Sequence, residues 1–144
     1  MEKDFDFSTV PYQYPLCLNR QCPKAANCLR QIAERHMPDS TAYCYIVNPR
    51  HLATLEGDCP YFRSDNKIQY AKGFIGFLEK LPHRQMLQVS NTLIACFNRR
   101  TYFRVRKGER LLSPAEQQIV ADTCRECGVS IPVVFDAYLE DYDW

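Results

Sequence analysis

Residues 17–28 read CLNRQCPKAANC, so that three cysteines fall in one short stretch, and a fourth, Cys59, follows before Pro60. The spacing of the first three is Cys17-x4-Cys22-x5-Cys28. Structural zinc takes four ligands at tetrahedral corners, and thiolates are among its preferred donors. A short loop with three thiolates can surround one side of the ion, while Cys59 closes the other side. The sequence therefore predicts a zinc site made by Cys17, Cys22, Cys28 and Cys59.

Two other interpretations of these four cysteines remain open. Cys22 and Cys59 each precede a proline, an arrangement that also occurs near iron–sulfur clusters, so the same residues are candidates for such a cluster. The thiols would otherwise pack as small hydrophobic side chains. His36 and His51 are nearby nitrogen donors able to replace one thiol, although each is expected to be a surface or loop histidine.

A functional role is less expected for the other four cysteines. Cys44 lies in the aromatic and β-branched run 43–47, which predicts a strand with Cys44 in the core. Cys96 is expected on the buried face of a helix. Cys124-x2-Cys127 has a redox or metal spacing, but the pair closes a helix, where the helix dipole opposes a thiolate. Whether Cys124 and Cys127 have a function stays undecided.

Length and composition restrict the class of protein. The chain has 144 residues, 46% hydrophobic and 24% charged, with a net charge of +1. These values exclude a disordered tail, a coiled coil and a collagen-like repeat. No apolar stretch approaches the roughly 20 residues of a membrane-spanning helix. The acidic start lacks the basic residues and apolar run of a secretory signal, so a cytoplasmic protein is expected, in which thiols stay reduced.

Several helices are predicted from apolar spacing and capping residues. One is expected over residues 23–35, with Cys28 on its second turn. Ser113-Pro114-Ala115-Glu116 forms a capping box, and Gly128 ends the helix that follows. The predicted helices of the second half cover about residues 66–81, 83–97, 113–127 and 132–144. The spacing of Ile68, Ala71, Ile75 and Leu78 is the basis for the first of these.

The expected fold is mainly α with minor β. Residues 1–65 form a cysteine-rich, metal-stapled part that begins with an extended aromatic arm over residues 1–16. Residues 66–144 form a bundle of about four helices against which the first part packs. The two parts together would make either two domains or one compact domain.

A basic stretch over residues 99–110 is the candidate nucleic-acid site. Arginines alternate with aromatic side chains there, a mixture suited to phosphate contact and base stacking. The near-zero net charge instead favours a solvated face, or pairing with the acidic tail over residues 134–144. Residues 101–112 are equally compatible with a small hairpin. The candidate residues are Arg99, Arg100, Tyr102, Arg104, Arg106 and Arg110.

Two functional classes find little support in the sequence. The last two predicted helices partly imitate a helix-turn-helix, but the last carries four acids and no lysine or arginine, so we reject it as a DNA reader. No glycine-rich phosphate loop, serine elbow or local Cys–His pair is present, so no catalytic residue is predicted. A non-enzymatic binding or regulatory module with zinc is expected, and its partner, a protein or a nucleic acid, is left open.

Several motifs resemble a family of small, cysteine-rich bacterial proteins of gut anaerobes that carries only a domain-of-unknown-function label. The similarity spans most of the chain and implies a cytosolic bacterial protein with the four-thiol site, without implying a substrate or a catalytic residue. The motifs are Cys17-x4-Cys22-Pro23-x4-Cys28-Leu29-Arg30, Cys59-Pro60-Tyr61-Phe62-Arg63, Tyr102-Phe103-Arg104, Gly108-Glu109-Arg110, Leu112-Ser113-Pro114-x-Glu116-Gln117 and Phe135-Asp136-x-Tyr138.

Overall fold

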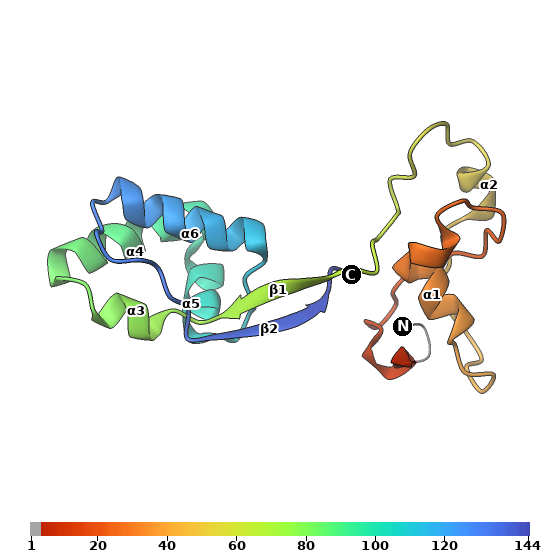
Figure 1. Cartoon of the computed structure of the whole chain (residues 1–144), viewed down its shortest axis with the longest axis horizontal. Helices are drawn as coiled ribbons and strands as arrows, with labels where there is room; N and C mark the ends of the chain where they lie inside the picture. The colour runs from red at the N-terminus through yellow and green to blue at the C-terminus, as the bar shows by residue number, and fades with distance from the viewer. Residues whose placement is uncertain (1–3) are drawn as a thin grey trace. The chain divides into compact units, whose positions relative to one another are not determined.

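The chain folds mainly into helices, with one small sheet. The structure, a computed structural model, describes residues 4–144, so the first three residues of the expected arm lie outside it. Within that range the sheet pairs two strands, β1 and β2 (Figure 1). None of the described helices combines the length and the apolar character needed to cross a membrane. In chain order the elements are η2 (Phe7–Thr9), η3 (Ala25–Asn27), α1 (Leu29–Arg35), α2 (Pro49–Leu52), β1 (Lys67–Lys72), α3 (Ile75–Glu79), α4 (His83–Phe97), α5 (Arg99–Lys107), α6 (Pro114–Glu126) and β2 (Ala137–Tyr142).

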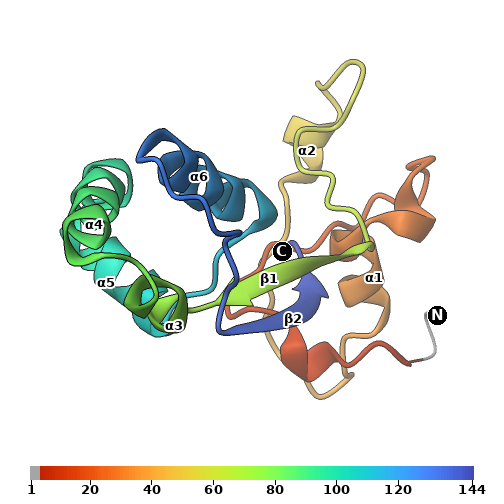
Figure 2. The same ribbon diagram turned by 60° about the vertical axis from the view of Figure 1, so that its left-hand side comes forward.

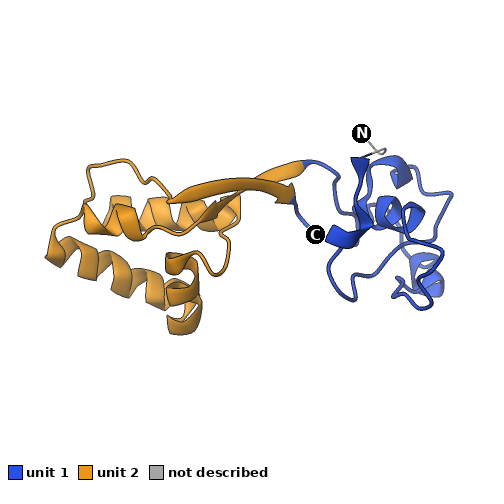
Figure 3. Cartoon of the chain, turned by 90° about the horizontal axis from the view of Figure 1, so that it is seen from below, with its two compact units in different colours: residues 1–66, 142–144 blue, residues 67–141 orange. Residues whose placement is uncertain are grey.

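The residues group into two units (Figure 3). Unit 1 contains the described residues up to Asn66, together with Tyr142–Trp144. Unit 2 contains Lys67–Asp141. The boundary predicted after residue 65 lies one residue before the end of the first segment of unit 1, and residues 142–144, predicted in the second part, belong to unit 1.

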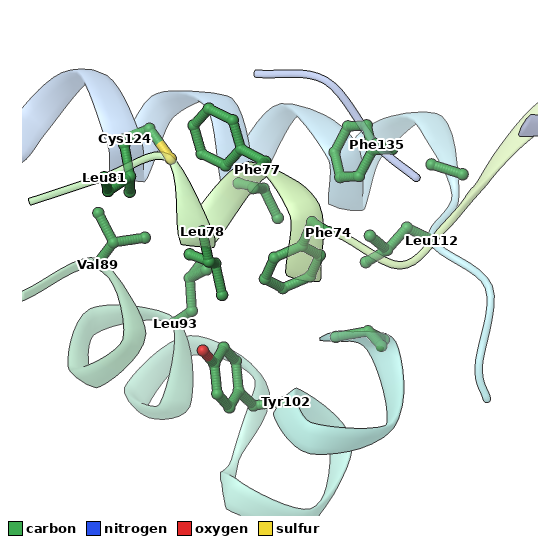
Figure 4. Packing of buried hydrophobic residues seen from close by; sticks show 13 residues of the cluster. Phe74, Phe77, Leu78, Leu81, Val89, Leu93, Tyr102, Leu112, Cys124 and Phe135 are labelled. Atoms are coloured by element: carbon green, nitrogen blue, oxygen red, sulfur yellow. The ribbon is translucent and has the colours of Figure 1, made fainter. Parts of the chain in front are cut away.

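Unit 2 is built around an apolar cluster supplied by α3, α4, α5 and α6 (Figure 4). The predicted helix over residues 83–97 is confirmed as α4, whose Val89 and Leu93 are fully buried. α5 and α6 both contact α4, and Figures 1 and 2 show α4 beside each of them. The buried Tyr102 hydroxyl donates to Ser90 Oγ at 2.7 Å, so the polar atom of this core ring has a partner.

The predicted capping box is confirmed at the start of α6. Ser113 Oγ accepts a hydrogen bond from Glu116 N at 3.3 Å, and Glu116 Oε1 accepts one from Ser113 N at 3.1 Å. Burial alone would raise the pKa of Glu116, but its bonds from the Ser113 backbone and from Arg110 lower that pKa below its ordinary value. Gly128, at φ +80°, lies just beyond the helix end, as predicted.

The helix predicted over residues 66–81 is wrong. Residues 67–72 form β1, and only Ile75–Glu79 are helical, as α3. Ala71 exchanges two backbone hydrogen bonds with Leu112, of 3.0 and 2.9 Å, which holds this segment extended. Gly73 then turns the chain at φ +76°, a conformation that residues with a Cβ rarely adopt.

The helix predicted from Pro132 to the C-terminus is also wrong, because residues 137–142 pair with β1 as strand β2. Asp136, just before β2, accepts hydrogen bonds from Ile75 N at 3.0 Å and Gly76 N at 3.1 Å. It thereby caps α3 from a distant part of the chain. The basic segment forms helix α5 rather than a hairpin.

Three expectations for individual segments need correction. Residues 23–35 are not one helix: Cys28 is extended and pairs with Ser64, so α1 starts only at Leu29 and Cys28 is its N-cap. The run 43–47 makes an isolated bridge between Ile46 and Leu16 instead of a strand, and Cys44 is exposed rather than in the core. Cys96 is exposed as well, in the last turn of α4.

The aromatic residues of the N-terminal arm pack within unit 1. The ring of Phe5 lies 5.2 Å from that of His36 and 6.2 Å from that of Trp144. Tyr14 lies edge-on to Trp144, with ring centroids 5.2 Å apart. The last residues of the chain therefore belong to the packing of unit 1.

Candidate metal centre

The four cysteines singled out from the sequence line one small cavity in unit 1. Cys28 is buried, and Cys17, Cys22 and Cys59 are each partly buried at its wall. The cavity measures about 30 Å³. Pockets for small organic ligands are about 300–1,000 Å³, whereas a single water-sized sphere needs roughly 10–15 Å³. This cavity is therefore closer in size to an ion than to a small organic molecule.

Backbone hydrogen bonds tie together the segments that carry the cysteines. Cys17 N donates to Arg30 O at 3.3 Å, which joins the first segment to α1. Leu29 N donates to Arg63 O at 2.8 Å, which joins α1 to the segment that follows Cys59. The positions of Cys17, Cys28 and Cys59 relative to one another are thus fixed by main-chain contacts.

Gln31 brings a polar group to the cavity wall. Its side chain is 1% exposed, and its Nε2 donates to Cys17 Sγ at 3.3 Å and to Asn19 O at 2.6 Å. Gln31 is thus a further residue of the site, and its sequence context carries no signal for that role.

Arg30 is a buried cation at the same cavity. It is 9% exposed, with its Nε donating to Tyr61 O at 2.7 Å and its Nη1 to Pro15 O at 2.8 Å. The guanidinium also lies over the ring of Tyr14, 4.6 Å from the centroid. Across residues 4–144, no carboxylate forms an ion pair with it. An anionic group in the cavity would offset the cost of this buried positive charge.

A second cation lies at the rim. Lys24 also lines the cavity, and its Nζ is 3.5 Å from the exposed Asp58 and 5.0 Å from the centroid of the Phe62 ring. Arg30 and Lys24 together bring two positive charges to the wall of the cavity that the four cysteines line.

The two histidines considered as substitutes for a thiol do not line this cavity. His36 Nδ1 lies 2.8 Å from Ile32 O, and His51 Nε2 lies 2.9 Å from the hydroxyl of Tyr61. Each ring is therefore engaged elsewhere in unit 1.

The sulfurs do not form a closed coordination shell. Among residues 4–144, no group of three or more Cys, His, Asp or Glu side chains has the arrangement of a metal site. The four thiols thus share a cavity, with Cys17 oriented by Gln31, without being gathered around one point. A cysteine side chain has a single χ1 torsion, so rotation between staggered positions is the movement by which the sulfurs would converge.

Cys124 and Cys127 lie in unit 2, at the end of α6. Burial, followed by the neighbouring Cys127, raises the pKa of the Cys124 thiol to about 11. Cys124 is therefore a neutral thiol of the core at physiological pH, unlike the low-pKa thiol of a redox pair.

The basic candidates also lie in unit 2. Arg99, Arg100 and Arg104 are exposed along α5, while Arg110 forms an ion pair of 2.9 Å with Glu116. Tyr102, which the sequence grouped with them, is 1% exposed, so its ring belongs to the core.

Comparison with known proteins places the whole chain in one family. No curated protein and no solved structure matches it significantly. A family model, described as a family of unknown function (DUF6078), matches residues 1–144. The motifs on which the resemblance rested thus lie in a chain whose full length fits that model, and the protein belongs to this family of unknown function.

Proposed function

We propose that Cys17, Cys22, Cys28 and Cys59 bind one zinc ion, and that this ion is a structural centre of a non-enzymatic binding or regulatory module. The observation that carries the proposal is that all four thiols, from segments far apart in the sequence, line one ion-sized cavity. Four thiolates and Zn²⁺ carry a net charge of −2. Arg30, which is buried and has no carboxylate partner among residues 4–144, and Lys24 at the rim supply compensating positive charge.

The small core of unit 1 is a second argument for a stabilising metal ion. Five buried hydrophobic residues belong to the described part of unit 1, namely Leu16, Cys28, Leu29, Ile32 and Ala33, whereas thirteen belong to unit 2. Units of this size with little core usually need a disulfide or a metal for stability. All eight cysteines are free, so a metal is the available cross-link. Bound zinc contributes on the order of 10 kcal/mol to the folding of such small sites.

The direct test is metal content combined with cysteine variants. Protein prepared without oxygen should contain one zinc per chain, and Cys22→Ser and Cys59→Ser should each lose most of it, because a three-thiolate site binds more weakly. Cys44→Ser is the matched control. It removes an exposed cysteine of the same unit, away from the cavity, and should keep the full zinc content.

Two results would count against the site. Full zinc content in both Cys22→Ser and Cys59→Ser would show that the ligand set is wrong. If the anaerobic preparation contained iron and inorganic sulfide and were visibly coloured, the same cysteines would hold an iron–sulfur cluster instead of zinc.

A further inference from the structure

We propose that the solvent-facing side of α5 is a docking surface for single-stranded nucleic acid, independent of the zinc centre. α5 carries five cations and no acid in nine residues. Tyr102 and Val105 are buried on one side of the helix, so Arg100, Arg104 and Lys107, at i, i+4 and i+7, run along the opposite, exposed side. Unit 2 as a whole has eleven Lys and Arg against eight Asp and Glu, a net charge of +3.

Helix stability explains only some of these charges, because Arg104, Arg106 and Lys107 lie in the last turn, where the helix dipole favours cations. Cations in the first turn oppose the helix dipole, and Arg99 and Arg100 occupy that turn with no acidic residue beside them. Arg100 and Arg104 are a like-charged i, i+4 pair, which is also unfavourable. Within residues 4–144, none of the five cations of α5 forms an ion pair with a carboxylate. Unfavourable local choices of this kind are expected at functional surfaces.

Phe103 adds an aromatic element to this surface. It is half-buried, and the guanidinium carbons of Arg99 and Arg106 lie 5.4 and 5.9 Å from the centroid of its ring. Aromatic rings and guanidinium planes are the groups on which unpaired bases stack, while the remaining arginines neutralise phosphates. The combination of a cation stripe with one flanked ring fits a single strand better than a duplex, whose bases are already stacked.

The same geometry argues against a membrane as the partner. Helices that lie in a lipid surface insert an apolar face, and the apolar face of α5 is already used in the core through Tyr102 and Val105. The three cations of the stripe, Arg100, Arg104 and Lys107, would neutralise about three phosphates of a single strand. The logarithm of affinity should then fall against the logarithm of salt concentration with a slope of about −2.

The test measures binding of a fluorescein-labelled, mixed-sequence RNA single strand by anisotropy at increasing NaCl concentration, with the full chain. Wild type should bind at low salt with the slope given above. Arg100→Gln/Arg104→Gln should weaken binding on the order of tenfold and flatten the slope by about 1.4. Phe103→Leu should weaken binding on the order of tenfold while the slope stays unchanged, because leucine keeps the packing but not the stacking.

Lys80→Gln/Arg84→Gln is the control, since it removes two exposed cations from the same unit outside α5 and should bind as wild type does. Circular dichroism verifies that each variant is folded. Four results would overturn the proposal: no binding by wild type at low salt, equal losses in the control and in the α5 variant, equal affinity for a duplex, or tighter binding to phosphatidylserine vesicles than to the strand.

Discussion

Arg30 combines two roles that only the folded chain reveals. Its guanidinium links the main-chain oxygens of Pro15 and Tyr61, which belong to the segments carrying Cys17 and Cys59, and it brings a buried positive charge to the thiols. A lysine at this position would keep the charge but not the two hydrogen bonds, because an ammonium is not a planar fork. Replacing Arg30 by lysine therefore tests the contribution of the hydrogen bonds separately from the contribution of the charge.

We expect Arg30→Lys to lower the free energy of unfolding of unit 1 by about 1.5–3 kcal/mol, the range for hydrogen bonds to charged groups. Urea unfolding followed by the fluorescence of Trp144, the single tryptophan and a part of unit 1, measures this loss. Arg50→Lys, an exposed position of the same unit, is the control and should unfold as wild type does. If the urea midpoint of Arg30→Lys were unchanged, the guanidinium hydrogen bonds to Pro15 and Tyr61 would contribute nothing to the stability of unit 1.

At the residue scale, the sequence grouped four cysteines that line one cavity but did not indicate which other residues surround them. The spacing of Cys17, Cys22 and Cys28 and the Cys-Pro pairs indicated one site, and these residues and Cys59 share a cavity. Arg30 and Gln31 gave no comparable signal, because a charged and a polar residue in a short helix are usually solvated. They are buried because α1 lies with five consecutive residues, Leu29–Ala33, in the interior.

Among the elements, β1 and α3 show why the spacing of apolar residues predicted the wrong structure over residues 66–81. Ile68, Ala71, Ile75 and Leu78 have helical spacing, yet the first two lie on a strand and the last two on a helix. The pattern continues across Gly73, whose φ of +76° separates the two elements. Pairing with β2 and with Leu112 decides the conformation here, and both partners are distant in the sequence. α4 was predictable from its apolar stripe and α6 from its capping box, because both signals are local in the sequence.

Gly73 is the residue on which this turn depends. A Cβ added there would lie 2.8 Å from Asp136 Oδ2, the carboxylate that caps α3, and the backbone would keep a left-handed φ. We expect Gly73→Ala to destabilise unit 2 by more than the roughly 1–2 kcal/mol of the left-handed conformation alone. Thermal unfolding followed by circular dichroism measures the loss.

Gly57→Ala provides the matched control for that prediction. Gly57 has the same φ of +76°, but a Cβ there would meet no atom within 4 Å, so only the conformational cost applies. If Gly73→Ala and Gly57→Ala lowered the stability of their respective units equally, the capping carboxylate of Asp136 would tolerate the added Cβ.

In the molecule as a whole, the two units are stabilised in different ways. Unit 2 has an extensive apolar cluster and does not need a cross-link, whereas unit 1 depends on few buried side chains, on aromatic contacts with Trp144 and, by our proposal, on zinc. The long helices α4, α5 and α6 all lie in unit 2. The two units therefore have separate spectroscopic signals: tryptophan emission for unit 1 and most of the helical circular dichroism for unit 2.

Removal of zinc should separate these signals. A chelator of higher affinity should shift the emission of Trp144 to longer wavelength, because unit 1 loses its cross-link and exposes the ring, while most of the helical dichroism persists. Re-addition of zinc should reverse the shift, and the exposed-cysteine variant Cys44→Ser should behave as wild type does. If the emission and the dichroism changed together, the two units would unfold as one, and zinc would stabilise the entire chain. If neither changed although the metal had been removed, the packing around Trp144 would hold unit 1 together without any ion.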